Sequence, residues 1–199
     1  MARQGNLFDV PPGAGNGVGP HLALPPRQLR DWQQRLAAFQ APLFAGEGPC
    51  QSQVSLFSHA VEGPEAVAEQ LDPLRLQPQP LSFWRWPEAP QQGAALYFVL
   101  DRPPELEQPL LLYVGETGQA DRRWKGEHDC KRYLAAYGEA LVKAGLEGRP
   151  SIRFWLDAPG AIKPRRALEQ ALIRRWQPPF NKETRERWAT PFTAEGDSV

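Results

Sequence analysis

The sequence predicts an α+β protein with a small three-stranded antiparallel sheet flanked by helices. Two observations carry this prediction. Three short runs rich in apolar, β-prone residues lie in the second half of the chain, and a segment with helical periodicity follows the second run and another follows the third. The order β-β-α-β-α allows the first two strands to form a hairpin and the helices to pack on the sheet.

The first two strands are predicted at 94–100 and 109–114, and the eight residues between them suit a hairpin loop. The next segment is predicted to be a helix that starts at Arg122. Asp121 can cap its first turn, and no proline interrupts the next 28 residues.

A third strand is predicted at 151–156, where apolar residues alternate with others in the run SIRFWL. The last helix is predicted at 163–176, and Pro178 and Pro179 stop it. These elements lie between 94 and 176, and residues 183–199 are predicted to form a C-terminal tail.

The amino-terminal half is less regular. Residues 11–26 contain nine Gly or Pro, so 1–26 is predicted to be a flexible arm. Leu29, Trp32, Leu36 and Phe39 recur at helical spacing and predict a helix at 27–41. The region 27–92 as a whole is a proline-rich extension with at least one helix and no evident role.

Signals between 42 and 92 are mixed. A short strand is expected at 54–57, a short helix at 65–71 and an extended piece at 81–86. Five prolines separate these pieces: Pro73, Pro78, Pro80, Pro87 and Pro90.

The net charge of zero averages two unlike halves. Residues 1–90 hold 6 Lys or Arg and 8 Asp or Glu, whereas residues 121–188 hold 16 and 9, a balance of +7. The overall balance excludes a histone-like polycation, and the basic second half indicates a polyanionic partner.

The sequence predicts a cytoplasmic location. No apolar run approaches the roughly 18 residues that span a bilayer, and the first twelve residues lack the apolar core of a signal peptide. Cys50 and Cys130 are too few for a disulfide scaffold, although a single bridge between them stays open.

Two charged residues fall on faces that periodicity assigns to the protein interior. Glu169 lies within the apolar arc of the last helix, and Arg123 continues the apolar stripe of the earlier helix backwards. The stripe itself consists of Cys130, Leu134, Tyr137 and Leu141. Because buried charges are costly unless they are paired or bound, Arg123 and Glu169 either form a buried salt bridge or belong to a binding site.

Short motifs surround these two residues in a fixed order. They read Ala95-Leu96-Tyr97, Tyr113-Val114-Gly115, Arg123-Trp124-Lys125, Glu169-x-x-Leu172-Ile173 and Pro178-x-Phe180-Asn181. Over about 93–182 the chain resembles the GIY-YIG nuclease domain, a catalytic module of homing endonucleases, restriction enzymes and excision-repair nucleases.

The resemblance implies a metal-dependent endonuclease that hydrolyses phosphodiester bonds in DNA. It assigns Tyr97 and Tyr113 to the two motif tyrosines, one of which is the base, and leaves open which one. It implies that Arg123 clamps the phosphate, that Glu169 binds one divalent ion, Mg²⁺ or Mn²⁺, and that Asn181 closes the site. These residue types suit the reaction, since a carboxylate holds a hard cation and a guanidinium pairs with phosphate oxygens.

The chain departs from the family pattern in one position that matters. Four residues after the arginine the family usually has His or Tyr, whereas this chain has Glu127, with His128 next to it. Either His128 serves in the relay of protons or that role is weakened. The alternative function is therefore a catalytically weak or inactive protein of the same fold that binds nucleic acid.

Other residues are expected to bind the substrate. Gly115 would allow the backbone to approach it closely. Basic side chains would contact phosphates, chiefly Lys125, Lys131, Arg165 and Arg166.

The segment Gln53–Phe57 (QVSLF) resembles the short motif that binds the bacterial sliding clamp. Such a peptide can enter a preformed apolar groove through its Leu-Phe pair. The same residues can equally be a buried strand, so a clamp-associated accessory protein stays a further alternative.

Overall fold

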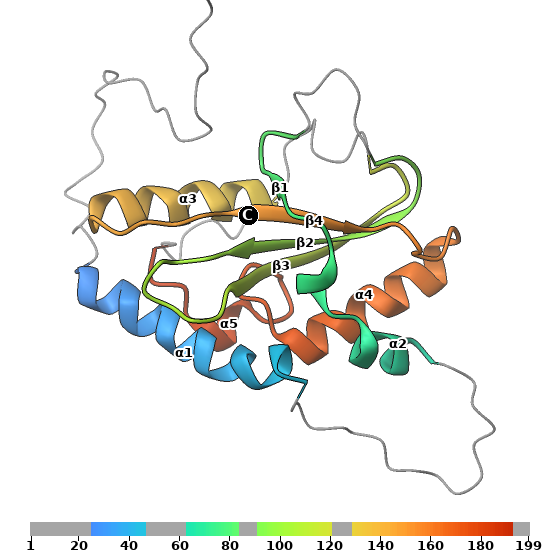
Figure 1. Cartoon of the computed structure of the whole chain (residues 1–199), viewed down its shortest axis with the longest axis horizontal. Helices are drawn as coiled ribbons and strands as arrows, with labels where there is room; N and C mark the ends of the chain where they lie inside the picture. Colours follow the sequence, from blue (N-terminus) through green and yellow to red (C-terminus); the bar gives the residue numbers. More distant parts are fainter. Residues whose placement is uncertain (1–24, 47–62, 84–90, 121–128, 193–199) are drawn as a thin grey trace, which may run out of the picture.

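A computed structural model describes residues 25–46, 63–83, 91–120 and 129–192. Its main elements in chain order (Figure 1) are α1 (Pro26–Phe44), α2 (Pro64–Gln70), a short 3-10 turn (Pro73–Arg75), β1 (Gln79–Pro80), β2 (Ala95–Asp101), β3 (Leu110–Thr117), α3 (Asp129–Lys143), β4 (Ser151–Trp155), α4 (Ile162–Trp176) and α5 (Arg185–Trp188). The α+β class is thus confirmed.

The sheet has four antiparallel strands rather than the three that were predicted, in the order β1-β4-β2-β3. The additional strand, β1, pairs Gln79 with Ile152 and Pro80 with Ser151. It was missed because two residues are too short to show alternation, and proline is tolerated only at such an edge position. In place of the extended piece expected at 81–86, residues 81–82 form a turn and residue 83 has 3-10 geometry, and residues 84–86 lie outside the described ranges.

The segment before β1 is tied to β4 by a buried arginine. Nη1 of Arg153 donates to the carbonyl oxygens of Pro73, Leu74 and Leu76, at 3.1, 2.8 and 3.0 Å. Burial lowers the pKa of Arg153. These bonds hold the proline-rich segment against the sheet although it has little regular structure of its own.

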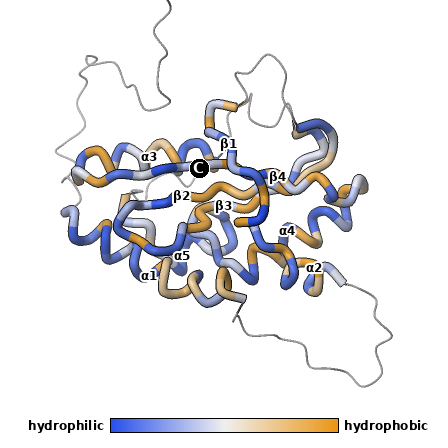
Figure 2. Tube along the Cα trace, in the orientation of Figure 1, coloured by the Kyte–Doolittle hydropathy of each residue, from blue (hydrophilic) through white to orange (hydrophobic). Residues whose placement is uncertain are grey.

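Strand β2 lies between β4 and β3, and all of its residues are buried. Its side chains alternate between two apolar clusters. Tyr97 and Val99 face a cluster that includes residues of α1, α3 and α5, whereas Leu96 and Phe98 face a cluster formed with α2 and α4. Figure 2 shows the apolar β2 and β3 among helices with hydrophilic stretches. Helices therefore cover both faces of the sheet, which explains why β2 reads as a continuous apolar run.

Helix α1 shares the core with the predicted domain. Leu29, Trp32 and Leu36 are fully buried, and Nε1 of Trp32 donates to the carbonyl oxygen of Trp188 at 3.2 Å. Its apolar face is the one that the spacing predicts, although the helix continues to Phe44. The region before the sheet thus contributes to the same core.

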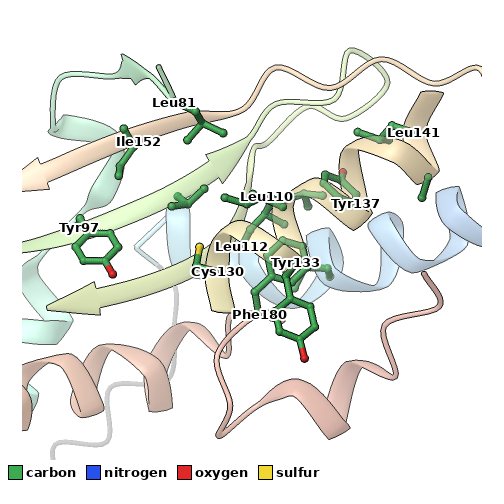
Figure 3. Packing of buried hydrophobic residues seen from close by; sticks show 14 of the residues in the cluster. Leu81, Tyr97, Leu110, Leu112, Cys130, Tyr133, Tyr137, Leu141, Ile152 and Phe180 are labelled. Atoms are coloured by element: carbon green, nitrogen blue, oxygen red, sulfur yellow. The ribbon is translucent and has the colours of Figure 1, made fainter. Parts of the chain in front are cut away.

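Helix α3 places its predicted stripe against the sheet, and Cys130, Leu134, Tyr137 and Leu141 are all buried. Figure 3 shows Cys130, Tyr133 and Tyr137 close to Phe180, which follows α4. The residues expected to form the start of this helix, 121–128, lie outside the described ranges. None of the described helices is long and apolar enough to cross a membrane.

Candidate active site

The candidate site lies along β3, which is the last strand of the sheet. The outer edge of such a strand carries backbone groups that need partners. Gln40 of α1 supplies two of them, because its Nε2 donates to the Leu111 carbonyl oxygen at 3.0 Å and its Oε1 accepts from the Leu111 amide at 2.8 Å. One residue further, the amide of Phe180 donates to the Leu112 carbonyl oxygen at 3.0 Å.

Asn181 continues this row of edge contacts. Its Oδ1 accepts from the amide of Val114 at 2.9 Å, and its Nδ2 donates to the carbonyl oxygen of the same residue at 2.8 Å. Its side chain is only 4% exposed. A buried two-point contact of this kind fixes the backbone beside Tyr113, so Asn181 orients the strand that carries the second motif tyrosine.

Glu169 makes the last contact of the row. Its Oε1 accepts a hydrogen bond of 3.0 Å from the amide of Glu116. The side chain is half-buried, and this agrees with its predicted place inside the apolar arc of α4. No ion pair of Glu169 is seen among the described residues, but its suggested partner Arg123 lies outside them.

Gly115 lies next to the rings of both motif tyrosines. The rings of Tyr97 and Tyr113 stack with centroids 5.9 Å apart, and Figure 3 shows Tyr97 beside the strands. A Cβ on residue 115 would overlap Cζ and the hydroxyl oxygen of Tyr97 and lie 2.8 Å from Cε1 of Tyr113. The glycine was expected to admit substrate, but here its missing side chain makes room for Tyr97.

A pocket of about 150 Å³ opens where these contacts end. Its lining consists of Tyr113, Asp129, Glu169, Ile173, Phe180, Asn181, Lys182, Glu183 and Arg185. Asp129, Lys182 and Glu183 are exposed, so solvent reaches the pocket. This volume is large enough for several water molecules, which suits a hydrated ion or a phosphate group.

The two tyrosines differ in their access to this pocket. Tyr113 is half-buried and belongs to the lining, whereas Tyr97 is fully buried behind it. The sequence does not distinguish them, because both are aromatic residues on predicted strands. The difference arises from the packing of the Tyr97 ring over Gly115.

The environment of Glu169 favours its neutral form. Burial, followed by the nearby negative charge of Glu116, raises the pKa of Glu169 to about 7. The Glu116 amide and the Arg166 charge act in the opposite direction, while Glu183 adds to the rise. A cation bound near Glu169 would relieve this accumulation of negative charge.

The donor set fits a divalent ion held by one protein carboxylate. Within the described ranges, no three His, Cys, Asp or Glu side chains form a group that could hold an ion. Glu169 uses Oε1 for a backbone amide, and a carboxylate retains further lone pairs for a metal. Mg²⁺ commonly binds through one or two carboxylates and completes its shell with water and phosphate.

Arg165 was expected to contact phosphates, but it is only 3% exposed. Its Nε donates to Glu116 Oε2 at 2.6 Å, and its Nη1 donates to the carbonyl oxygens of Pro159 and Gly160 at 3.0 and 2.7 Å. Arg166 is exposed and lies 3.3 Å from Glu116 Oε1. Of this pair, only Arg166 is accessible to a phosphate.

Several predicted residues cannot be placed. Arg123, Lys125, Glu127 and His128 lie outside the described ranges, as does the segment Gln53–Phe57. Lys131 is half-buried on α3, two residues after Asp129, which lines the pocket.

Two residues of the site were missed. Gln40 carries no sequence signal, because its partner Leu111 is 71 residues away and is contacted through its backbone. Glu116 had a weak signal, since it directly follows the second motif glycine. A scan against protein-family models finds no match for this chain, and neither does a search of curated proteins or of solved structures.

Proposed function

We propose that the protein is a metal-dependent endonuclease of the GIY-YIG type that hydrolyses phosphodiester bonds in DNA. The observation that carries this proposal is the pocket, since Tyr113, Glu169 and Asn181 line it together. Each of them occupies a motif position of the resemblance, and they come from β3, α4 and the segment after α4.

Glu169 is the proposed ligand of Mg²⁺ or Mn²⁺. When bound, such an ion supplies positive charge at the phosphate and stabilises the leaving oxygen. A cation bound beside Glu169 would favour the ionised form of its carboxyl near neutral pH, since burial and negative neighbours hold the pKa of this group at about 7. The Glu116 amide holds one carboxylate oxygen in place.

Tyr113 is the proposed general base. A phenol has a reference pKa near 10, so a positive charge beside it must stabilise the phenolate before it can accept a proton from water. Its place in the pocket lining supports this role. Tyr97 would support the ring of Tyr113 from behind, since it is fully buried.

Arg123 remains the proposed phosphate clamp, and His128 the proposed participant in proton transfer. The basic balance of residues 121–188 supports a polyanionic substrate. Lys125, Lys131 and Arg166 are the proposed phosphate contacts outside the reacting centre. Arg165 is left out of this set because its guanidinium is buried.

The test is cleavage of plasmid, branched and single-stranded DNA with Mg²⁺ or Mn²⁺. Glu169→Gln should reduce the rate by at least about 100-fold, the scale seen when a charge-stabilising group is removed. Tyr113→Phe should cause a similar loss. Tyr97→Phe is the matched control, because it removes a hydroxyl from the buried tyrosine, and we expect a loss of less than about 10-fold.

Two outcomes would contradict the proposal. If wild-type protein cleaves DNA no faster than Glu169→Gln does, this site does not carry nuclease activity. If both proteins nevertheless bind DNA with equal affinity, the chain is a binding module of the same fold, which is the alternative that Glu127 suggests.

A further inference from the structure

Arg165 is a buried cation one helical turn before Glu169, and arginines are rarely buried without partners. Three oxygen atoms surround its guanidinium. They belong to the side chain of Glu116 and to the backbone of Pro159 and Gly160. Arg165 therefore joins the end of β3 to the loop before α4.

Glu116 contacts α4 at two successive turns. Its carboxylate contacts Arg165 and Arg166 in the first part of the helix, at 2.6 and 3.3 Å. Its backbone amide donates to Glu169 Oε1 at 3.0 Å. Because the side chain and the amide belong to one residue, holding the carboxylate also limits the movement of the amide.

We infer that Arg165 is a positioning residue for the metal ligand Glu169. By fixing Glu116 it keeps the amide that orients the Glu169 carboxylate in place. Partners one step removed from a metal commonly set the orientation of its ligands in this way. The inference rests on the proposed function, since it assumes that Glu169 binds a divalent ion.

Arg166 provides an internal comparison. It contacts the same carboxylate as Arg165, but its side chain is 68% exposed. Exposed ion pairs contribute little, because water screens the charges and long side chains lose entropy on pairing. If the orientation of the Glu169 carboxylate depended only on positive charge near Glu116, Arg165 and Arg166 would contribute equally to metal binding. If this orientation depends on the buried contacts, only the removal of Arg165 would weaken metal binding.

The experiment measures Mn²⁺ binding by calorimetry and by the electron paramagnetic resonance signal of the free ion. Arg165→Gln should raise the Kd by roughly 10-fold or more, the usual effect of losing a partner that orients a ligand. Arg165→Lys should fall between this variant and wild type, because an ammonium cannot reproduce the planar fork. Arg166→Gln, the matched control, should change the Kd by less than about 2-fold.

Hydrogen exchange at the Glu116 amide gives a second, local measurement. Arg165→Gln should accelerate it, while Arg166→Gln should leave it near the wild-type rate. If Arg165→Gln fails to fold, Arg165→Lys and Glu116→Gln replace it, and both should weaken Mn²⁺ binding by more than the control. Equal Kd values in the Arg165 and Arg166 variants would overturn the inference.

Glu169→Gln separates this inference from the proposed function. If it binds Mn²⁺ as well as wild type, the proposed metal site itself is wrong. If it loses the ion while the Arg165 variants retain wild-type affinity, only the positioning role is wrong.

Discussion

A buried and a half-buried carboxyl group in this protein contrast in how their hydrogen-bonding oxygens are satisfied. Asp101, at the end of β2, is fully buried and accepts from the Tyr137 hydroxyl at 2.8 Å and from the Arg149 amide at 2.6 Å. Gln33 in turn donates to the Tyr137 hydroxyl oxygen at 2.7 Å. Glu169, on α4, is half-buried at a solvent-reached pocket and accepts from one backbone amide.

Burial raises the pKa of both carboxyl groups, but the next cause differs. For Asp101 it is the hydrogen bond from Tyr137, which lowers the pKa. For Glu169 it is the charge of Glu116, which raises the pKa further. The burial of Tyr137 itself, together with the negative charge of Asp101, also raises the pKa of Tyr137 well above its usual value. A closed network thus suits a structural role, and an open carboxylate among negative neighbours suits cation binding.

The largest effect is expected from removing Asp101, the carboxyl group that belongs to the closed hydrogen-bond network. Asp101→Ala leaves the Tyr137 hydroxyl and the Arg149 amide without their acceptor. We expect a loss of roughly 2–4 kcal/mol in the free energy of unfolding, measured by urea denaturation. Cleavage per folded molecule should be unchanged.

The matched control is Asp157→Ala, an exposed aspartate on the loop before α4, which should change stability by less than about 0.5 kcal/mol. A loss of cleavage without a loss of stability in Asp101→Ala would show that the closed carboxyl is functional, against the comparison.

The next test concerns Gly115, which lies against Tyr97 and Tyr113 near the pocket that contains Glu169. Gly115→Ala places a methyl group against the buried Tyr97 ring, which has to shift. Overpacking of this kind costs about 1–3 kcal/mol of unfolding free energy, and thermal denaturation would measure it. Cleavage should fall as well, because Tyr113 stacks on Tyr97.

Gly118→Ala serves as the control, since its Cβ would meet only Nη2 of Arg165 at an ordinary 3.5 Å. Equal effects at the two glycines would rule out Tyr97 packing as the reason for Gly115.

The smallest expected effect comes from neutralising the open carboxylate. The raised pKa favours folding at low pH, and this contribution is lost as pH rises from 4.5 through about 7. Glu169→Gln avoids the loss, so without metal it should be more stable than wild type at pH 8 by about 1–2 kcal/mol, after allowance for solvent screening. Near pH 4.5 this advantage should be close to zero.

Denaturation in urea at both pH values, with a chelator present, measures this difference. Glu183→Gln, which removes an exposed carboxylate from the same pocket, should gain less than about 0.5 kcal/mol. Adding Mg²⁺ should stabilise wild type and leave Glu169→Gln unchanged. If the difference in stability between wild type and Glu169→Gln did not depend on pH, the surroundings of Glu169 would not raise its pKa.

Local patterns predicted much of the fold. Apolar runs and helical spacing place β2, β3, β4, α1 and α4 within a few residues of their observed bounds. Strand β1 was missed because two residues carry no periodicity, and the long-range partner of Gln40 is a backbone group. Arg165 was predicted to contact phosphates, but it is buried against Glu116. The spacing of residues on a helix does not show which arginine pairs with a carboxylate 49 residues away.

The sequence by itself determined the order of the elements and the inward face of Glu169, because hydrophobic periodicity is a local property of the chain. Only the tertiary structure decided which tyrosine reaches the pocket and which carboxyl is closed. Both outcomes depend on residues far apart in the chain: Asp101 meets Tyr137 and Arg149, while Glu116 meets Arg165 and Glu169. Burial and charge pairing across these distances set the chemistry of each carboxyl, and no local pattern encodes them.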